Sequence, residues 1–309
     1  MTRVGKVRAP GKAILVGEYA VLEGAPAVST AVNRFVEVMI GATESPASGP
    51  FVAAARQVVA RHLGAAADVA LTIDSTQLYV GARKLGLGSS AAVTTATVAA
   101  LITAAGRVLP DPAELFALVD EAHQLAQVEV GSGVDVATAI AGGVVRFSRR
   151  PFALDLVALP AALRLTFIDI GASASTPQLV ATVRRWRDRD AAGYRTVIDR
   201  LAAAARDFSS APHAAGAIAA AHDAYTGMVE LGHRADAPIA IPPFVELAAI
   251  ARAHGAASKP SGAGGGDLAV LFSDGDEATQ QLRAAITRAG FSILDLAANA
   301  AGVSVERLS

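Results

Sequence analysis

The segment from Ser89 to Gly106 constrains the fold more than any other part of the chain. It reads SSAAVTTATVAALITAAG and contains no charged residue. Ala and Leu favour helices, Ser89 is of a type that caps helix N-termini, and Gly106 is typical of the residue that follows a helix. A helix that is apolar on every face is buried. The sequence therefore predicts a helix that is enclosed by the protein core.

Other segments show strand and helix patterns in turn. From the N-terminus to about Ile40, apolar runs broken by Gly, Pro and Asn predict strands joined by turns. Asp111 is placed to cap a helix that starts at Pro112. Expected helices cover 51–63, 112–127, 177–190, 192–208, 214–231, 244–254 and 277–289, and expected strands cover 69–74, 78–80, 142–147, 154–159, 163–170, 268–272 and 291–296. Strands followed by mixed helices and strands indicate an α+β fold.

Composition excludes several kinds of function. The chain has no cysteine, which excludes disulfides, thiolate zinc sites and cysteine nucleophiles. Lys plus Arg (27) nearly equals Asp plus Glu (28), so no overall field attracts nucleic acid or an anionic membrane. No apolar run reaches the roughly 20 residues of a membrane span, and the first residues lack an apolar signal segment. We expect a cytoplasmic enzyme without nucleic-acid or membrane partners.

A glycine-rich turn leads into the apolar helix. Gly86 and Gly88 allow the backbone to pass close to a ligand, and Ser89 and Ser90 begin the helix. The first N–H groups of a helix lack partners within it, and the helix dipole favours negative charge there. The sequence therefore predicts a phosphate site at this helix N-terminus.

Two other interpretations of this turn remain open. One is an ordinary capped helix after a glycine turn. The other is a dinucleotide-binding turn in which Gly86, Gly88 and Ala91 match GxGxxA, but that motif needs a strand running straight into it, and Arg83 and Lys84 intervene. No GxxxxGK followed by Ser or Thr occurs, which excludes the P-loop motif.

Two lysine-containing segments and one aspartate add further candidates. KPSGAGGGD, from Lys259 to Asp267, has four glycines and lies between two strand patterns, which predicts a constrained loop. Lys12 follows Pro-Gly, and a turn there would fix a compact positive charge where a phosphoryl group moves. Asp135 in GSGVD either caps the helix pattern VATAIAG or orients a reacting group, and the two roles are compatible.

In order and spacing, these segments resemble the three motifs of the GHMP kinases, the superfamily of galactokinase, homoserine kinase, mevalonate kinase and phosphomevalonate kinase. The resemblance spans Arg8 to Asp267. It implies a two-lobed fold, with a mixed sheet-and-helix N-terminal lobe (1–160) that binds ATP, an α/β C-terminal lobe (161–309) and the active site between them. It also implies ATP and Mg²⁺ as cofactors, and a monomer or homodimer.

The resemblance implies a role for each motif residue. Lys12 and Asp135 are implied as catalytic residues, with Asp135 accepting or orienting the proton of the acceptor. Nucleotide contacts are implied for Lys84, Gly86, Leu87, Gly88, Ser89, Ser90 and Ala91. Substrate contacts are implied for Glu18, Tyr19, Ser132, Gly133, Ser175, Thr176, Ser261, Gly262, Ala263 and Gly264.

Ser90 and Gln127 are implied as metal ligands. Mevalonate kinases have a Mg²⁺-binding glutamate where this chain has Gln127, and Glu129 lies two residues further on. His123 has no second histidine in a metal-binding pattern, so we expect it to pack or to form a local hydrogen bond.

Within the family, the chain most resembles the phosphomevalonate kinases. It reads GEYAVLEG, with Tyr19 where mevalonate kinases have histidine, and it shares AQ before GSGVDVA and Asp267 after the glycines. The resemblance implies transfer of phosphate from ATP to phosphomevalonate, giving diphosphomevalonate. A phosphorylated acceptor requires additional positive charge or anion-binding backbone. The candidates are Arg83, Lys84, Arg146 and the Ser173, Ser175 and Thr176 cluster.

Other functions on the same fold remain alternatives. Mevalonate kinase or another GHMP kinase would use the same machinery on an unphosphorylated acceptor. Diphosphomevalonate decarboxylase is a third reading, although that family lacks the lysine after Pro-Gly. A ligand sensor without turnover would be expected to lose Lys12 or Asp135, and both are present.

Overall fold

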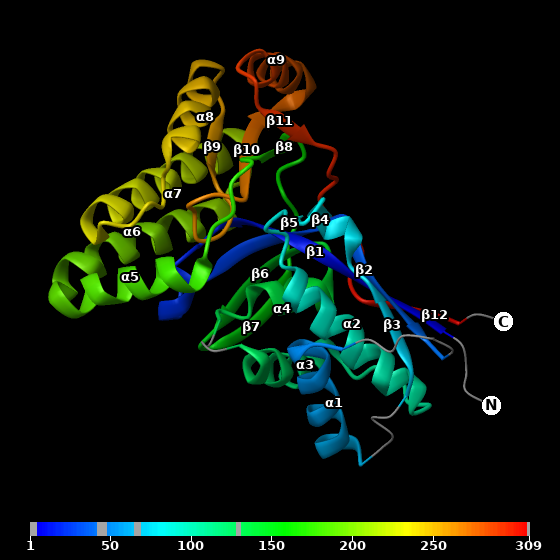
Figure 1. Ribbon diagram of the computed structural model, residues 1–309. Helices are drawn as coiled ribbons and strands as arrows, with labels where there is room; N and C mark the ends of the chain where they lie inside the picture. The colour runs from blue at the N-terminus through cyan, green and yellow to red at the C-terminus, as the bar shows by residue number, and fades with distance from the viewer. Residues whose placement is uncertain (1–4, 42–47, 65–68, 128–130, 308–309) are drawn as a thin grey trace. The chain divides into compact units, whose positions relative to one another are not determined.

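The computed structural model describes residues 5–41, 48–64, 69–127 and 131–307. These residues form helices and antiparallel sheets (Figure 1), which confirms the predicted α+β class. None of the helices in these ranges is long and apolar enough to cross a membrane.

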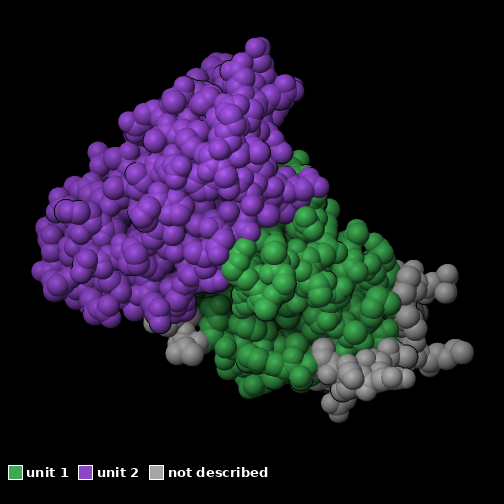
Figure 2. All heavy atoms as spheres, turned by 45° about the horizontal axis from the view of Figure 1, so that its top comes forward, with its two compact units in different colours: residues 1–12, 30–145, 297–309 green, residues 13–29, 146–296 purple. Residues whose placement is uncertain are grey.

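Contacts within the chain divide it into two compact units (Figure 2). Unit 1 comprises residues 1–12, 30–145 and 297–309, and unit 2 comprises residues 13–29 and 146–296. This division by contacts differs from the two consecutive lobes expected from the sequence, 1–160 and 161–309, and those lobe boundaries stay a prediction.

The longest strands are β1 (Gly5–Val16) and β2 (Ala27–Ile40), which are neighbours in a sheet of order β12-β1-β2-β6-β7, with β3 also pairing with β2. The other strands of this sheet are β3 (Leu71–Asp74), β6 (Val144–Arg149), β7 (Phe152–Leu156) and β12 (Ser304–Arg307). In unit 1, β12 pairs antiparallel with the start of β1, so the first and last described segments of the chain lie side by side.

The predicted turn at Pro10 and Gly11 is wrong, because β1 runs through both residues and through Lys12 without a break. Gly11 is required for a different reason. A Cβ atom at this position would lie 2.8 Å from a methyl group of Leu78 and 3.0 Å from the carbonyl oxygen of Leu87. The Lys12 N–H also donates to the Leu87 carbonyl oxygen over 2.9 Å. The glycine therefore lets the segment before α2 pack directly on β1, which fixes Lys12 beside it.

Helix α2 (Ser89–Ala104) is enclosed as predicted. It packs against three other helices of unit 1, namely α1 (Pro50–Leu63), α3 (Pro112–Ala126) and α4 (Val134–Ala141). Ala96, Ala99 and Leu101 in its middle are completely buried. A short hairpin of β4 (Tyr79–Val80) and β5 (Arg83–Lys84) follows the 3₁₀ turn η2 (Thr76–Leu78) and leads into the glycine turn before α2.

The helix caps of unit 1 agree only in part with the prediction. Asp111 caps α3 by accepting hydrogen bonds from the N–H groups of Ala113 and Glu114, as expected. Ser89 does not cap α2, because the capping position is Gly88, whose φ is 72°. Only glycine adopts this left-handed conformation without strain. No side chain caps the first N–H groups of α2.

Unit 2 is built on an antiparallel sheet of order β11-β8-β10-β9. The sheet consists of β8 (Leu163–Asp169), β9 (Ala257–Pro260), β10 (Leu268–Asp274) and β11 (Ser292–Leu294). The helices of the unit are η1 (Ala20–Glu23), α5 (Thr176–Arg189), α6 (Ala191–Ser210), α7 (Ala214–Ala235), α8 (Pro242–Ala253) and α9 (Gly275–Arg288). Helices α7, α8 and α9 pack on the sheet, and α6 packs along α7. Phe244, Leu247 and Leu271 belong to the core between sheet and helices.

Candidate active site

The glycine turn before α2 has the geometry that suits an anion. Gly86 and Gly88 have φ values of 74° and 72°, and Ser89, Ser90 and Ala91 form the first turn of the helix. Three free N–H groups at an uncapped helix N-terminus, with the positive end of the dipole, suit a phosphate. The Leu87 side chain is buried and anchors the turn. Lys84, at the end of β5, is exposed and forms no ion pair with any residue in the described ranges.

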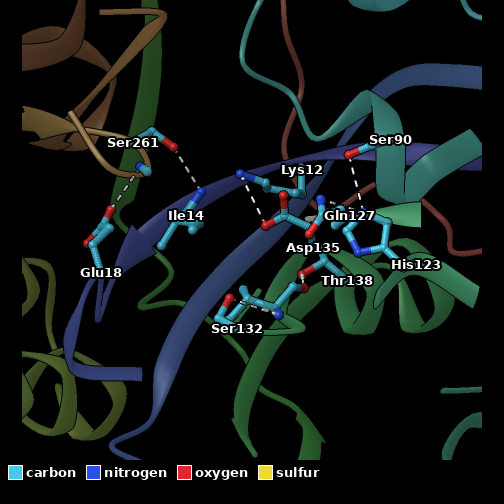
Figure 3. Close-up of polar contacts among 12 residues, drawn as sticks. Lys12, Ile14, Glu18, Ser90, His123, Gln127, Ser132, Asp135, Thr138 and Ser261 are labelled. Carbon is cyan, nitrogen blue, oxygen red and sulfur yellow. Dashed lines mark hydrogen bonds and ion pairs between the residues drawn. The ribbon is translucent and has the colours of Figure 1, made fainter. Parts of the chain in front are cut away.

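Lys12 and Asp135 meet beside this turn (Figure 3). The Lys12 ammonium nitrogen lies 3.3 Å from a carboxylate oxygen of Asp135. A Cβ atom on Gly88 would lie 3.1 Å from Lys12 Cε and 3.2 Å from Asp135 Oδ2. Lys12 is only 6% exposed, so its charge is held in one place. The structure thus brings the two residues predicted to be catalytic, 123 positions apart in sequence, to the backbone of the glycine turn within unit 1.

Asp135 reaches Lys12 because of the way α4 begins. The capping position is Gly133, with φ 87°, and the Ser132 hydroxyl accepts a hydrogen bond from the Val134 N–H over 3.3 Å. Asp135 lies in the first turn of the helix, not at the cap. Of its two predicted roles, capping is therefore wrong, and its carboxylate is left to pair with Lys12.

The two residues predicted as metal ligands share a partner in His123. Its Nε2 atom lies 3.2 Å from the Ser90 hydroxyl and 3.2 Å from Nε2 of Gln127. The imidazole also stacks on Phe51, with ring centroids 5.4 Å apart. The prediction that His123 packs or forms a local hydrogen bond is confirmed.

The donors around Ser90 fit magnesium held mainly by a nucleotide. No group of three or more His, Asp or Glu side chains in the described part of the chain forms a metal site of its own. Ser90 offers a neutral oxygen beside the anion site, and Mg²⁺ usually takes few protein ligands when it binds with phosphates. Glu129, the other candidate near Gln127, lies outside the described residues.

The loop between β9 and β10 in unit 2 is constrained, as its glycines predicted. Gly262, Gly264, Gly265 and Gly266 all have positive φ. A Cβ atom on Gly264 would lie 2.5 Å from the Ile239 carbonyl oxygen, and one on Gly266 would lie 2.7 Å from the Ala172 carbonyl oxygen. Close packing on neighbouring backbone therefore holds the loop.

This packing leads to a matched pair of substitutions. Gly262 has φ 102° but open space around its Cβ position, whereas Gly264 has both a positive φ and a backbone clash. We expect G262A to lower the free energy of unfolding by about 1–2 kcal/mol from backbone strain alone. We expect G264A to lower it by about 3–5 kcal/mol, since overpacking adds to the strain. Urea denaturation of both variants measures the difference, and equal losses would contradict the close packing at Gly264.

Residues 14–19 hold the same loop (Figure 3). The Ser261 hydroxyl accepts a hydrogen bond from the Ile14 N–H over 2.8 Å. The Tyr19 hydroxyl donates to the Ala263 carbonyl oxygen over 2.6 Å, and a Glu18 carboxylate oxygen accepts from the Gly262 N–H over 3.3 Å. Burial, together with the nearby Glu18, raises the pKa of the Tyr19 phenol above its ordinary value, so it remains a donor at neutral pH.

The residues predicted to contact a substrate in unit 2 therefore differ in accessibility. Glu18 and Ser261 are buried, and they contact backbone groups and Lys259. Ser175 and Thr176 are exposed at the start of α5, where Ser175 occupies the capping position without a side-chain cap bond. The substrate roles of all these residues stay predictions.

The basic candidates for a second phosphate also differ. Arg146 is engaged with Asp155, and its Nη2 atom lies 2.9 Å from Oδ2 of that aspartate. Arg83 lies in β5, next to Lys84.

The sequence analysis assigned no role to Lys259, whose ammonium group pairs with Glu18. The available signal was a single charge inside the otherwise uncharged strand pattern AASKP.

Comparison with known proteins places this arrangement in a family. Residues 50–143 match the family described as GHMP kinases N terminal domain. The phosphomevalonate kinase of Streptomyces sp. strain CL190 is 31% identical, over 87% of this chain and 89% of that protein.

Two solved structures share the fold. The Lin0012 protein of Listeria innocua superposes with a TM-score of 0.89 at 23% identity, covering 99% of this chain and 100% of that one. A Streptococcus pneumoniae phosphomevalonate kinase, solved in complex with phosphomevalonate and AMPPNP, gives a TM-score of 0.79 at 20% identity, covering 95% of this chain and 99% of that one. At 23% and 20% identity, the similarity to these two structures concerns the fold alone.

The family of the chain follows from the sequence comparisons. The match of residues 50–143 to the family model and the 31% identity to the Streptomyces relative over 87% of this chain show that the chain belongs to the GHMP kinases, among the members related to phosphomevalonate kinase.

Proposed function

We propose that the protein transfers the γ-phosphoryl group of ATP to phosphomevalonate and releases diphosphomevalonate and ADP. The observation that carries this proposal is the meeting of Lys12, Asp135 and the uncapped N-terminus of α2 in unit 1. Phosphoryl transfer requires positioning and charge stabilisation more than covalent chemistry, and these groups supply both. The activity named for the Streptomyces relative supports the choice of acceptor.

The turn before α2 binds the ATP phosphates in this proposal. The residues assigned to nucleotide binding are Lys84, Gly86, Leu87, Gly88, Ser89, Ser90 and Ala91. Backbone N–H groups at the helix N-terminus donate to phosphate oxygens, and Gly86 and Gly88 allow the backbone to approach them. Lys84 adds a flexible positive charge at the end of β5.

Mg²⁺ belongs to the proposal as a partner of the nucleotide. When bound, it supplies positive charge that neutralises the phosphate oxygens during transfer. We assign the Ser90 hydroxyl to hold it, and the Gln127 side chain contacts the same His123 nitrogen as Ser90. The amide of Gln127 carries no charge, so we assign it a weaker role than a glutamate would have.

A phosphate acceptor simplifies the chemistry. Its second pKa is about 6, so at neutral pH the attacking oxygen already carries a negative charge. The bond from the γ-phosphorus to the bridging oxygen of ADP breaks as the acceptor oxygen forms its bond to the same phosphorus, and no proton has to leave the acceptor. Lys12 offsets the concentrated negative charge, and Asp135 holds the Lys12 ammonium in place. An alcohol acceptor such as mevalonate would instead require a group that removes a proton.

Further acceptor contacts are assigned residue by residue. The exposed Ser175 and Thr176 at the N-terminus of α5 offer hydroxyl groups and free N–H groups to an anion. The Ser132 and Gly133 turn in unit 1 and the loop containing Gly262, Ala263 and Gly264 are assigned to the acceptor by family resemblance. The enzyme is proposed to act in the cytoplasm, where ATP is available, as a monomer or homodimer.

The proposal is tested by a coupled ADP-release assay with ATP and Mg²⁺. Phosphomevalonate, mevalonate and diphosphomevalonate are each supplied as the only acceptor, with a matched set lacking Mg²⁺. We expect Mg²⁺-dependent turnover with phosphomevalonate alone. Turnover with mevalonate alone would overturn the acceptor assignment but keep the kinase chemistry, and carbon dioxide release from diphosphomevalonate would indicate a decarboxylase. Absence of turnover with all three would favour another acceptor or a ligand sensor.

A further inference from the structure

Unit 2 contains a buried ion pair that the proposed chemistry does not use. The ammonium group of Lys259, on β9, contacts a carboxylate oxygen of Glu18, just after β1. The side chain of Lys259 is completely buried, and Glu18 is 3% exposed. The two residues are 241 positions apart in the sequence. Such a pair needs a physical reason, because each charge has been removed from water.

Stability alone is a weak reason for this pair. The desolvation of two charges usually offsets their attraction, and well-packed apolar residues of similar volume are often as stable or more so. In addition, Oε2 of Glu18 is buried without a hydrogen-bond partner among the described residues. A pair retained for stability would be expected to satisfy both carboxylate oxygens, because an unpaired buried acceptor is costly.

The contacts of the pair indicate a different role. The Lys259 ammonium also donates to the Pro260 carbonyl oxygen over 2.6 Å, and Glu18 Oε1 accepts from the Gly262 N–H over 3.3 Å. Both charged side chains therefore form hydrogen bonds with the backbone at the point where β9 passes into the glycine-rich loop. Glycines give this loop many accessible conformations when it is not held, so two charge-assisted bonds at its first residues select one of them.

We propose that the Glu18–Lys259 pair is a positioning device for the glycine-rich loop, and that Lys259 is a positioning residue for acceptor binding. The second part rests on the proposed function, which assigns Gly262, Ala263 and Gly264 of this loop to the acceptor. Glu18 then acts through the loop and not by touching the substrate, since both of its carboxylate oxygens are buried.

The test replaces both charges by methionine, which has a similar volume and no charge. The matched control is K6M/E37M, which removes another Lys–Glu pair, at 2.7 Å, that is partly exposed in unit 1. We expect E18M/K259M to melt within about 4 °C of the unaltered protein, because the pair contributes little net stability. We expect hydrogen exchange of the peptide covering residues 257–268 to become at least about tenfold faster, and the control to leave it unchanged.

Steady-state kinetics with phosphomevalonate then test the acceptor role. We expect the acceptor KM of E18M/K259M to rise about tenfold or more, while the KM for ATP stays within about twofold. The single variant K259M keeps an unpaired buried carboxylate, so it is expected to melt at a lower temperature than the double variant.

The outcomes separate the two levels of the proposal. Unchanged hydrogen exchange in a folded E18M/K259M protein would overturn the positioning role, whatever the enzyme's acceptor is. Faster exchange with an unchanged acceptor KM would overturn the link to acceptor binding. If E18M/K259M failed to fold while K6M/E37M folded, the pair would be a stabilising element and the inference would be wrong. Failure of the unaltered enzyme to use phosphomevalonate would contradict the proposed function and leave the exchange experiment valid.

Discussion

Replacement of Lys12 by methionine (K12M) is expected to lower kcat about 10²–10³-fold while the protein stays folded. Lys12 is buried on β1 beside Gly88, so its ammonium group is a fixed positive charge next to the proposed phosphate site. Removing one preorganised group that stabilises developing negative charge costs about this factor in kcat. Single-turnover kinetics with saturating ATP and phosphomevalonate measure the loss at the transfer step.

A lysine on the same strand provides the control for K12M. Lys6 pairs with Glu37 at the surface, and we expect K6M to keep kcat within about twofold because surface pairs contribute little. The dissociation constant of K12M for ATP is expected to change by less than about fivefold, since the α2 N-terminus binds the phosphates without Lys12. A K12M enzyme that retained a tenth or more of kcat would contradict the role of Lys12.

Replacement of Asp135 by asparagine (D135N) is expected to lower kcat about 100-fold. Asparagine has nearly the same shape but no charge, so the change releases the Lys12 ammonium from its 3.3 Å pairing. Misplacement of a catalytic group by about 1 Å is enough for a loss of this size. D276N, which removes a carboxylate paired with Arg164 on the surface of unit 2, is the control and is expected to leave kcat unchanged.

A double variant and a pH profile distinguish positioning from base catalysis by Asp135. If Asp135 acts through Lys12, K12M/D135N loses hardly more activity than K12M alone, because coupled groups are not additive. The acidic limb of the kcat/KM profile is then set by the acceptor phosphate, near pH 6, and persists in D135N. Loss of that limb in D135N, together with additive losses in the double variant, would instead identify Asp135 as a general base.

Much of unit 1 was predictable from local sequence. The apolar run that forms α2 is buried on all sides, and Asp111 caps α3, because both features depend on residues close together in the chain. Glycine was expected at 86 and 88 to let the backbone approach a ligand, and both residues have positive φ. The meeting of Lys12 with Asp135 followed from family resemblance and not from any local pattern.

The features that the sequence did not predict depend on contacts between distant segments. Pro10 and Gly11 favour a turn locally, but β1 runs through both residues, with Leu78 and Leu87 packed on Gly11. β12 pairs with β1 across almost the whole length of the chain. The Glu18–Lys259 pair was missed for the same reason, because a single charge in a short strand gives no indication of a partner 241 residues away.

The most direct test of the central claim is ³¹P NMR of a reaction containing the protein, ATP, Mg²⁺ and phosphomevalonate. The account predicts that the monoester signal of phosphomevalonate is replaced by two coupled diphosphate signals, with one equivalent of ADP formed for each equivalent consumed. A phosphomevalonate signal that stays unchanged under conditions where the same protein phosphorylates mevalonate would contradict the account.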